Sequence, residues 1–160
     1  MRIGVISDTH GHVDLTQDAV RMLESLEVEA VLHCGDVGGA DVVRQFHQWP
    51  THFVAGNCDY DLDSLGAAVD AEGQHWHGQF ADLAFDGVRV ALLHSHDRKR
   101  FKQTIQAGEH ELVCYGHTHV AAIDETGPVM VLNPGAVYRA SRPSVAVVEL
   151  SPLSATIVPL

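Results

Sequence analysis

The sequence predicts an α/β fold in which two stacked β-sheets lie between helices. Over the first sixty residues, short apolar runs alternate with amphipathic stretches in the order β-α-β-α-β. That order is typical of parallel strands with helices packed against the sheet. Beyond residue 78 the pattern changes to strands separated by tight loops, which indicates a second, β-rich half that leans toward antiparallel pairing.

The elements of the first half follow from hydrophobic spacing. Residues 2–7 form a nearly continuous apolar run that stops at Asp8, which is typical of a strand covered on both faces. Apolar residues at helical spacing predict helices over 13–27 and 41–49, the second ending before Pro50. Further short strands are predicted at 30–33 and 52–55, and the polar segment 60–74 is expected to be a loop or a short helix.

The second half contains a strong hairpin signal. Asp86-Gly87 separates the apolar stretches 79–85 and 88–94, and this dipeptide favours a two-residue turn. A short helix is expected over 98–107, capped by Gly108. The remaining strands are expected at 112–115, 120–124, 129–132, 144–150 and 155–159.

Length and composition restrict the class of protein. With 160 residues, 46% of them hydrophobic, the chain fits a single domain over 1–160 with its own core. No run approaches the roughly 18 apolar residues that a membrane helix needs. No apolar leader precedes the first strand, so we expect a cytoplasmic protein that does not associate with membranes. Three cysteines without a CxxC pair fit a reducing compartment and argue against a zinc-thiolate site.

The net charge of -11 bears on partners. Nucleic-acid binding depends on cations that neutralise phosphates, so a strongly acidic chain is a poor candidate for it. Carboxylates gathered to hold divalent cations would account for part of the negative charge.

Potential metal ligands stand just after the carboxyl ends of several expected strands. In open α/β sheets, ligands bind at these ends, so residues far apart in the sequence are expected to share one crevice. The candidates are Asp8, His10, Asp36, Asn57, His94, His117 and His119. Carboxylates and imidazoles together favour Mn²⁺, iron or Zn²⁺, and Asp36 is placed to bridge two ions.

Each candidate also has a structural explanation when taken alone. Asp8 or Asp36 could be a helix cap or a turn former, and Asn57 a turn residue. His94 could be a half-buried histidine with its hydrogen bonds satisfied. The pair His117 and His119 is harder to explain structurally, because both side chains of such a turn can face one crevice. The combination, in this order, predicts a metal centre.

The same residues resemble a known family. Asp8-x-His10, Gly35-Asp36, Gly56-Asn57-Cys58-Asp59, His94 and Gly116-His117-Thr118-His119 resemble, in order and spacing, the motifs of calcineurin-like metallophosphoesterases. With Asn133-Pro134-Gly135, they are most similar to the small YfcE-type phosphodiesterases of bacteria and archaea. The resemblance runs from Ile3 to about Gly135. It implies a four-layer α-β-β-α sandwich of two mixed sheets.

The resemblance also implies two divalent metal ions and a division of their ligands. One metal would be held by Asp8, His10, Asp36 and His119, and the other by Asp36, Asn57, His94 and His117. Mn²⁺ is the favoured metal, with Zn²⁺, Fe²⁺ or Ni²⁺ as alternatives. A metal-bridging hydroxide would attack phosphorus in line, and the Asn57 amide would stabilise charge on the transferring group.

The candidate catalytic residues are Asn57, Cys58, Asp59 and His96. Many members of the larger family carry histidine where this chain has Cys58, and that histidine is the candidate general acid. A thiol with an ordinary pKa of about 8.5 is a different kind of proton donor. We therefore expect slow turnover of esters with poor leaving groups. His96 is the candidate for a phosphate contact or a substitute acid.

Outside this set, the histidines have weaker functional claims. His12 is expected to be a solvated loop residue, and His33 either a support for a ligand or a residue without a role. No chemical role is expected for His47, His52, His75, His77 and His110. The basic run from Arg98 to Lys102 is either a solvated helix face or a contact for a phosphate or a partner.

Three functions follow from these patterns. The first is a hydrolase of small phosphodiesters, and also of phosphomonoesters. The second is a nuclease of the same superfamily, which the net charge of -11 disfavours. The third is an interaction scaffold of the same fold with weak or no activity, since the family includes a retromer subunit that serves as an interaction module. The terminal strand offers an edge through which a homo-oligomer could form.

Overall fold

The computed structural model describes all residues from 1 to 160 and places the strands in two sheets. The first sheet has the order β11-β10-β1-β2-β3-β4. Strands β1 to β4 pair in parallel, whereas β10 and β11 are antiparallel to their neighbours. The bounds are β1 (Arg2–Ile6), β2 (Ala30–His33), β3 (Thr51–Phe53), β4 (His75–Trp76), β10 (Ser144–Leu150) and β11 (Leu153–Pro159).

The second sheet has the order β5-β6-β7-β9-β8. Its three central strands are parallel, and the two edge strands run antiparallel to them. The bounds are β5 (Phe80–Phe85), β6 (Val88–Leu93), β7 (Leu112–Cys114), β8 (Ala122–Asp124) and β9 (Met130–Asn133).

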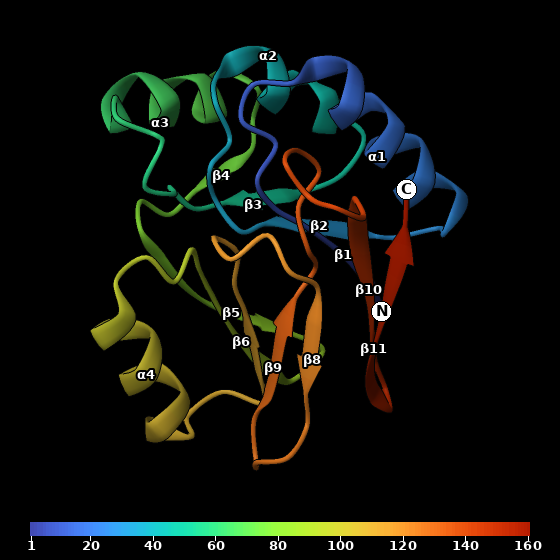
Figure 1. The fold of residues 1–160 in the computed structure, drawn as a ribbon, viewed down its shortest axis with the longest axis vertical. Helices are drawn as coiled ribbons and strands as arrows, with labels where there is room; N and C mark the ends of the chain where they lie inside the picture. The colour runs from blue at the N-terminus through green and yellow to red at the C-terminus, as the bar shows by residue number, and fades with distance from the viewer.

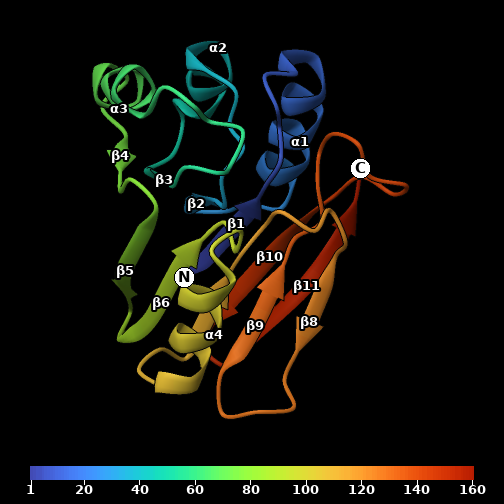
Figure 2. The ribbon, with the colours of Figure 1, turned by 60° about the vertical axis from the view of Figure 1, so that its left-hand side comes forward.

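The helices lie outside the pair of sheets. Figure 1 shows α1 (Val13–Ser25), α2 (Ala40–Val43) and α3 (Leu62–Ala71) together on the outer side of the first sheet. Helix α4 (Arg98–Ala107) lies alone beside the second sheet, in front of β6 and β9 in Figure 2. No helix of the chain is both long enough and apolar enough to span a membrane.

Three apolar layers fill the spaces between these elements. One cluster, which includes Leu23 and Phe46, joins the first sheet to α1–α3. A second, which includes Val5 and Leu92, lies between the two sheets. A third joins the second sheet to α4 through Phe101. The four-layer sandwich expected from the sequence is therefore confirmed.

The structure corrects several local predictions. The second half is more parallel than expected, because α4 carries the chain back to the starting end of the sheet between β6 and β7. The helix expected over 41–49 is α-helical only at Ala40–Val43 and continues as a 3₁₀ turn, η1 (Arg44–Phe46). Two adjacent β-branched valines, Val42 and Val43, weaken an α-helix at this point.

Two elements were not clearly expected. The segment predicted as a loop or short helix contains α3, and its N-cap is Asp61, whose side chain accepts a hydrogen bond from the Ser64 N–H. Strand β4 is two residues long, too short to leave a periodic signal. It forms one edge of the first sheet beside β3.

A stack of three histidines joins this edge to the segment after it. His52 on β3 lies opposite His75 on β4, with ring centroids 4.5 Å apart. His77 follows β4, and its Nε2 lies 2.9 Å from His52 Nδ1. Burial, together with the neighbouring His75 and His77, lowers the pKa of His52 to about 4. Burial and His75 also lower the pKa of His77. The folded protein therefore holds His52 and His77 neutral at neutral pH.

This stack predicts an acid-sensitive contribution to stability. In the unfolded chain, histidine titrates near 6.5, so between about pH 6.5 and about pH 4 the unfolded state binds more protons. The contribution is fully present above about pH 6.5 and is lost as the pH falls toward about 4. Chemical denaturation of metal-free protein at about pH 7 and about pH 5 measures this loss. His52→Gln should lose less stability on acidification than the wild type, whereas exposed His47→Gln should match the wild type. An unchanged pH dependence in His52→Gln would contradict the prediction.

Candidate metal centre

The loops that follow five strands bring the candidate metal ligands into one cluster. Asp8 and His10 follow β1, Asp36 follows β2 and Asn57 follows β3 in the first sheet. From the second sheet come the residues after β6 and β7, which are His94, His117 and His119. Contacts between the two groups, described below, show that the carboxyl ends of both sheets open on the same side of the molecule.

One part of the cluster consists of Asp8, His10 and His119, whose ligand atoms all lie within 4.8 Å of one another. Asp8 Oδ1 lies 3.1 Å from His119 Nε2 and 3.8 Å from His10 Nε2. Asp8 is completely buried, yet Oδ1 accepts no hydrogen bond. A buried carboxylate oxygen without a partner is costly, and a bound cation would satisfy it.

The other part joins Asp36, Asn57, His94 and His117. His94 Nε2 lies 3.3 Å from Asp36 Oδ2 and 3.1 Å from Asn57 Oδ1. Asn57 Oδ1 lies 2.8 Å from His117 Nδ1. His94 Nδ1 donates to the Cys34 carbonyl at 2.7 Å, so Nε2 is the ring atom that faces the two oxygens. Burial opposes the charged ring, but the hydrogen bond to Asp36 and the charges of Asp8 and Asp36 outweigh it and raise the pKa of His94. A divalent cation held by these atoms would take the place of the proton on His94 Nε2.

The distances suit divalent metals. Two ligand atoms that each lie about 2.1 Å from one ion are separated by about 3.0–3.4 Å in tetrahedral or octahedral geometry. Asp36 Oδ2 lies 3.5 Å from His10 Nε2 and 3.3 Å from His94 Nε2, so Asp36 stands between the two parts. The donor set of carboxylate, amide and imidazole therefore fits the metal site expected from the sequence.

The ionisation of these groups favours cation binding. Burial tends to raise the pKa of Asp36, but its bonds to His94 and to the Cys58 N–H outweigh burial and hold that pKa well below its usual range. Burial lowers the pKa of His10 and of His117. At neutral pH Asp36 is thus a carboxylate and these two imidazoles are neutral, which are the forms that coordinate metals.

The backbone of the cluster is strained. Five of the candidate ligands have a positive φ: 57° at Asp8, 47° at His10, 53° at Asp36, 78° at His117 and 58° at His119. The left-handed region costs a residue other than glycine about 1–2 kcal/mol. Such strain persists only where the surrounding structure holds it, and it gathers at functional sites.

Asp59 is one of the groups that hold these loops. Its Oδ2 accepts hydrogen bonds from the Gly56 N–H at 2.9 Å and the Val37 N–H at 3.1 Å. Its Oδ1 accepts a third from the Gly38 N–H at 2.9 Å. The carboxylate therefore ties the loop that carries Asn57 to the loop that carries Asp36, and the structure directs both of its oxygens toward backbone rather than toward the ligand cluster.

A second connection runs through the buried imidazole of His33. Its Nδ1 accepts from the Gly35 N–H at 3.3 Å, so its Nε2 donates to Thr9 Oγ1 at 3.0 Å. The Thr9 hydroxyl donates in turn to the Val37 carbonyl at 2.9 Å. Of the two sequence interpretations of His33, the structure supports the one in which it holds ligand-bearing loops.

Asn133 was not recognised from the sequence as a positioning group. Its Nδ2 donates to Thr118 Oγ1 at 3.0 Å and to the Gly116 carbonyl at 3.3 Å, while its Oδ1 accepts from the Gly135 N–H at 2.9 Å. It therefore supports the turn that carries His117 and His119. A buried polar residue at the end of an apolar strand was the available signal.

Close backbone approach explains the glycine that precedes Asn57. A Cβ at Gly56 would overlap the buried Asp36 carboxylate and the backbone N–H of Asp36. Neither group can move aside. Glycine at this position lets the Asn57 loop pack directly on Asp36.

The other proposed catalytic groups lie at the margin of the cluster. Cys58 is exposed as a whole. Partial desolvation of its thiol, together with the nearby Asp36, raises its pKa, so the thiol is neutral at pH 7. The ring of His96 lies 5.6 Å from that of His94 and 6.4 Å from that of His117, centroid to centroid. Burial and the neighbouring His94 lower the pKa of His96.

The basic run lies on α4, which has no fully buried residue. The Arg100 guanidinium lies 5.9 Å from the centroid of the Phe80 ring, and no carboxylate forms an ion pair with Arg98, Lys99, Arg100 or Lys102. Both interpretations of this run, a solvated helix face and a contact for a phosphate or a partner, therefore stay predictions.

The three bonds of Asp59 predict a structural defect on its removal. Asp59→Asn replaces one acceptor oxygen by a donor that faces backbone N–H groups, so we expect a loss of about 2–4 kcal/mol of stability. We also expect weaker binding of Mn²⁺, because the loops that carry Asp36 and Asn57 come apart. Denaturation and calorimetric metal titration measure the two effects, and Asp70→Asn on the exposed face of α3 serves as the control. Full stability with lost activity would instead make Asp59 a participant in the chemistry.

Comparison with known proteins places this chain in a family. Residues 1–152 match the model of the calcineurin-like phosphoesterase superfamily domain. A phosphodiesterase from Methanocaldococcus jannaschii is 29% identical over 154 residues, which cover 93% of this chain and 93% of that protein.

Solved structures agree. An archaeal phosphodiesterase has a TM-score of 0.91 and 26% identity over the full length of both chains. The YfcE phosphoesterase from E. coli shares the fold, with a TM-score of 0.68 and 20% identity over 99% of this chain and 98% of that chain. The family model spans almost the whole chain and includes every residue of the metal cluster. This chain is therefore a member of the calcineurin-like phosphoesterase superfamily.

Proposed function

We propose that this protein is a divalent-metal-dependent phosphodiesterase that hydrolyses small phosphodiesters and also accepts phosphomonoesters. The observation that carries the proposal is the buried Asp8 oxygen without a hydrogen bond, facing His119 within a cluster of further metal-ligating atoms. Homologues that are phosphodiesterases support the reaction class.

The ligands divide into two sets that share Asp36. The first metal would be held by Asp8, His10, Asp36 and His119, and the second by Asp36, Asn57, His94 and His117. The short distances within each set and the central place of Asp36 support this division. Mn²⁺ suits the mixture of oxygen and imidazole donors.

The two metals would supply Lewis-acid charge and an activated water for in-line displacement at phosphorus. The protein orients the groups around them. Because Asn57 Oδ1 faces His94 and His117, its Nδ2 is directed toward Cys58, 3.5 Å from the sulfur, at the exposed side of the cluster. From there Nδ2 can donate to an oxygen of the transferring phosphoryl group. Asp59 acts as a positioning residue through its three backbone bonds.

The scaffold alternative explains less of the structure. An interaction module has no need for buried carboxylates that face imidazoles, nor for five non-glycine residues in the left-handed region. Each of these features lowers stability and gains a purpose from bound metal and chemistry.

Removal of the shared carboxylate tests the proposal. Asp36→Asn should abolish hydrolysis of bis(p-nitrophenyl) phosphate and lower the number of Mn²⁺ ions bound per chain, because the amide is a weaker ligand and cannot bridge with two charged oxygens. Activity assays and metal analysis of the purified variant measure the two effects, and Asp70→Asn should behave as the wild type. An active Asp36→Asn, or an inactive wild type that binds no metal, would refute the proposal.

The raised pKa of Cys58 predicts a dependence on the leaving group. A neutral thiol is a poor proton donor at pH 7, so esters of p-nitrophenol should react at least roughly tenfold faster than esters of phenol under single-turnover conditions. Cys58→His introduces an imidazole at this position and should narrow the difference by accelerating the phenyl ester. Equal single-turnover rates for the two esters in the wild type would show that another group donates the proton.

A further inference from the structure

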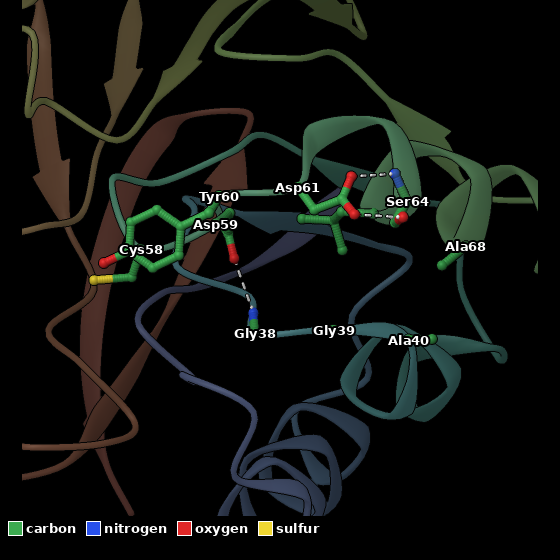
Figure 3. A pocket seen from close by; sticks show the side chains of 10 residues that line it. Gly38, Gly39, Ala40, Cys58, Asp59, Tyr60, Asp61, Ser64 and Ala68 are labelled. Carbon is green, nitrogen blue, oxygen red and sulfur yellow. Dashed lines mark hydrogen bonds between the residues drawn. The ribbon is translucent and has the colours of Figure 1, made fainter.

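A cavity of about 370 Å³ lies between α2 and α3, next to the metal cluster. Figure 3 shows it from close by, with Gly38, Gly39 and Ala40 along one side and Ala68 of α3 facing them. Cys58 and Tyr60 lie together at one end. The space stays open because the glycines and alanines that line it have no side chain large enough to fill it.

Cys58 belongs both to the wall of the cavity and to the margin of the metal cluster. The sulfur of Cys58 lies within 4.8 Å of ligand atoms of both His10 and Asp36. The Cys58 N–H also donates to Asp36 Oδ1 at 2.8 Å. The cavity therefore begins within one residue of the candidate ligands, close enough for a group attached to a phosphate at the cluster to reach it.

The polar groups of the cavity wall are already engaged. The carboxylate of Asp59 holds three backbone N–H groups, and that of Asp61 accepts from both the N–H and the hydroxyl of Ser64. Two carboxylates in the wall disfavour an anionic occupant, and no lysine or arginine lines the cavity to offset them. The other lining residues are uncharged, and they include Leu65, Ala68 and Tyr60.

Tyr60 is unusual because its side chain is 88% exposed. No other aromatic ring stacks on it, whereas most aromatic residues near the cluster pack against a neighbour. A tyrosine in this state offers a rigid apolar face to a ligand ring at little conformational cost. The volume is at the lower end of the range for ligand pockets, which suits a single ring system.

We infer that this cavity binds an uncharged aromatic ester group of the substrate phosphate, with Tyr60 stacking on the ring and Ala68 leaving space for it. The inference rests on the proposed function, since it assumes that a phosphate binds at the cluster. The preferred substrates are then phosphoesters with an aromatic ester group, and esters whose ester group carries a further negative charge are disfavoured.

Two phosphonates that differ in one substituent test the inference without turnover. Phenylphosphonate and methylphosphonate present the same phosphoryl oxygens, but only the first has a ring for the cavity. Calorimetric titration of Mn²⁺-loaded protein should show about tenfold tighter binding of phenylphosphonate, which corresponds to about 1.4 kcal/mol. Ring stacking and apolar burial are large enough to give this difference.

Two variants with a matched control locate the effect. Tyr60→Ala removes the stacking ring and Ala68→Phe fills the cavity, so each should reduce the phenyl advantage to about twofold or less. Binding of methylphosphonate should change by less than about twofold in both. Ala67→Phe adds the same ring to the neighbouring, exposed position on α3, which does not line the cavity, and should keep the full advantage.

The outcomes separate this inference from the proposed function. Equal affinities for the two phosphonates, failure of both to bind, or a phenyl advantage that survives Tyr60→Ala and Ala68→Phe would each overturn the inference. Hydrolysis of bis(p-nitrophenyl) phosphate, measured in parallel, tests the function. If the protein hydrolyses the diester but binds both phosphonates equally, only the proposed role of the cavity is refuted. If it binds phenylphosphonate selectively but does not hydrolyse the diester, the proposed phosphodiesterase function is refuted and the role of the cavity stands.

Discussion

The buried carboxylates of Asp8 and Asp36 face the Nε2 atoms of His119 and His94, at 3.1 Å and 3.3 Å. Removing such charges from water costs several kcal/mol per ion unless a partner compensates. The neighbouring structure supplies part of that compensation, through the Cys58 N–H for Asp36 and the His117 N–H for Asp8. The part of the negative charge that remains uncompensated favours binding of cations. The loops around the two carboxylates hold them in this environment.

The loops around the two carboxylates carry conformational strain. The ligand-bearing residues adopt left-handed backbone conformations, which bring their side chains inward from turns directly after the strands. Three buried side chains, Asp59, His33 and Asn133, hold these turns by hydrogen bonds to backbone groups. Neither Asp59 nor His33 has a ligand atom in the clusters that could hold an ion, and the amide of Asn133 is engaged with Gly116, Thr118 and Gly135. Precise placement of the candidate metal ligands thus depends on residues outside the ligand set.

Most strands, helices and candidate ligands could be predicted from the sequence, because their signals lie within short segments of it. The strand over Ser144–Leu150 and the helix over Arg98–Ala107 have the expected bounds, since their apolar spacing and caps are complete within the segment. Strand β4 and the parallel pairing of β6 with β7 depend on distant partners, which leave no periodic signal. For the same reason the ligand types at strand ends were visible, whereas the backbone bonds of Asp59 and Asn133 were not.

The metal cluster draws its residues from both sheets. Asp8 and Asp36 follow strands of the first sheet, and His94 and His119 follow strands of the second. Ions held between them would act as non-covalent cross-links that close long loops of the chain, and this lowers the entropy of the unfolded state. All three cysteines of the chain are free. The ions would then stabilise this protein in the way that disulfide bridges stabilise others. Binding of the ions would both activate the site and attach one sheet to the other.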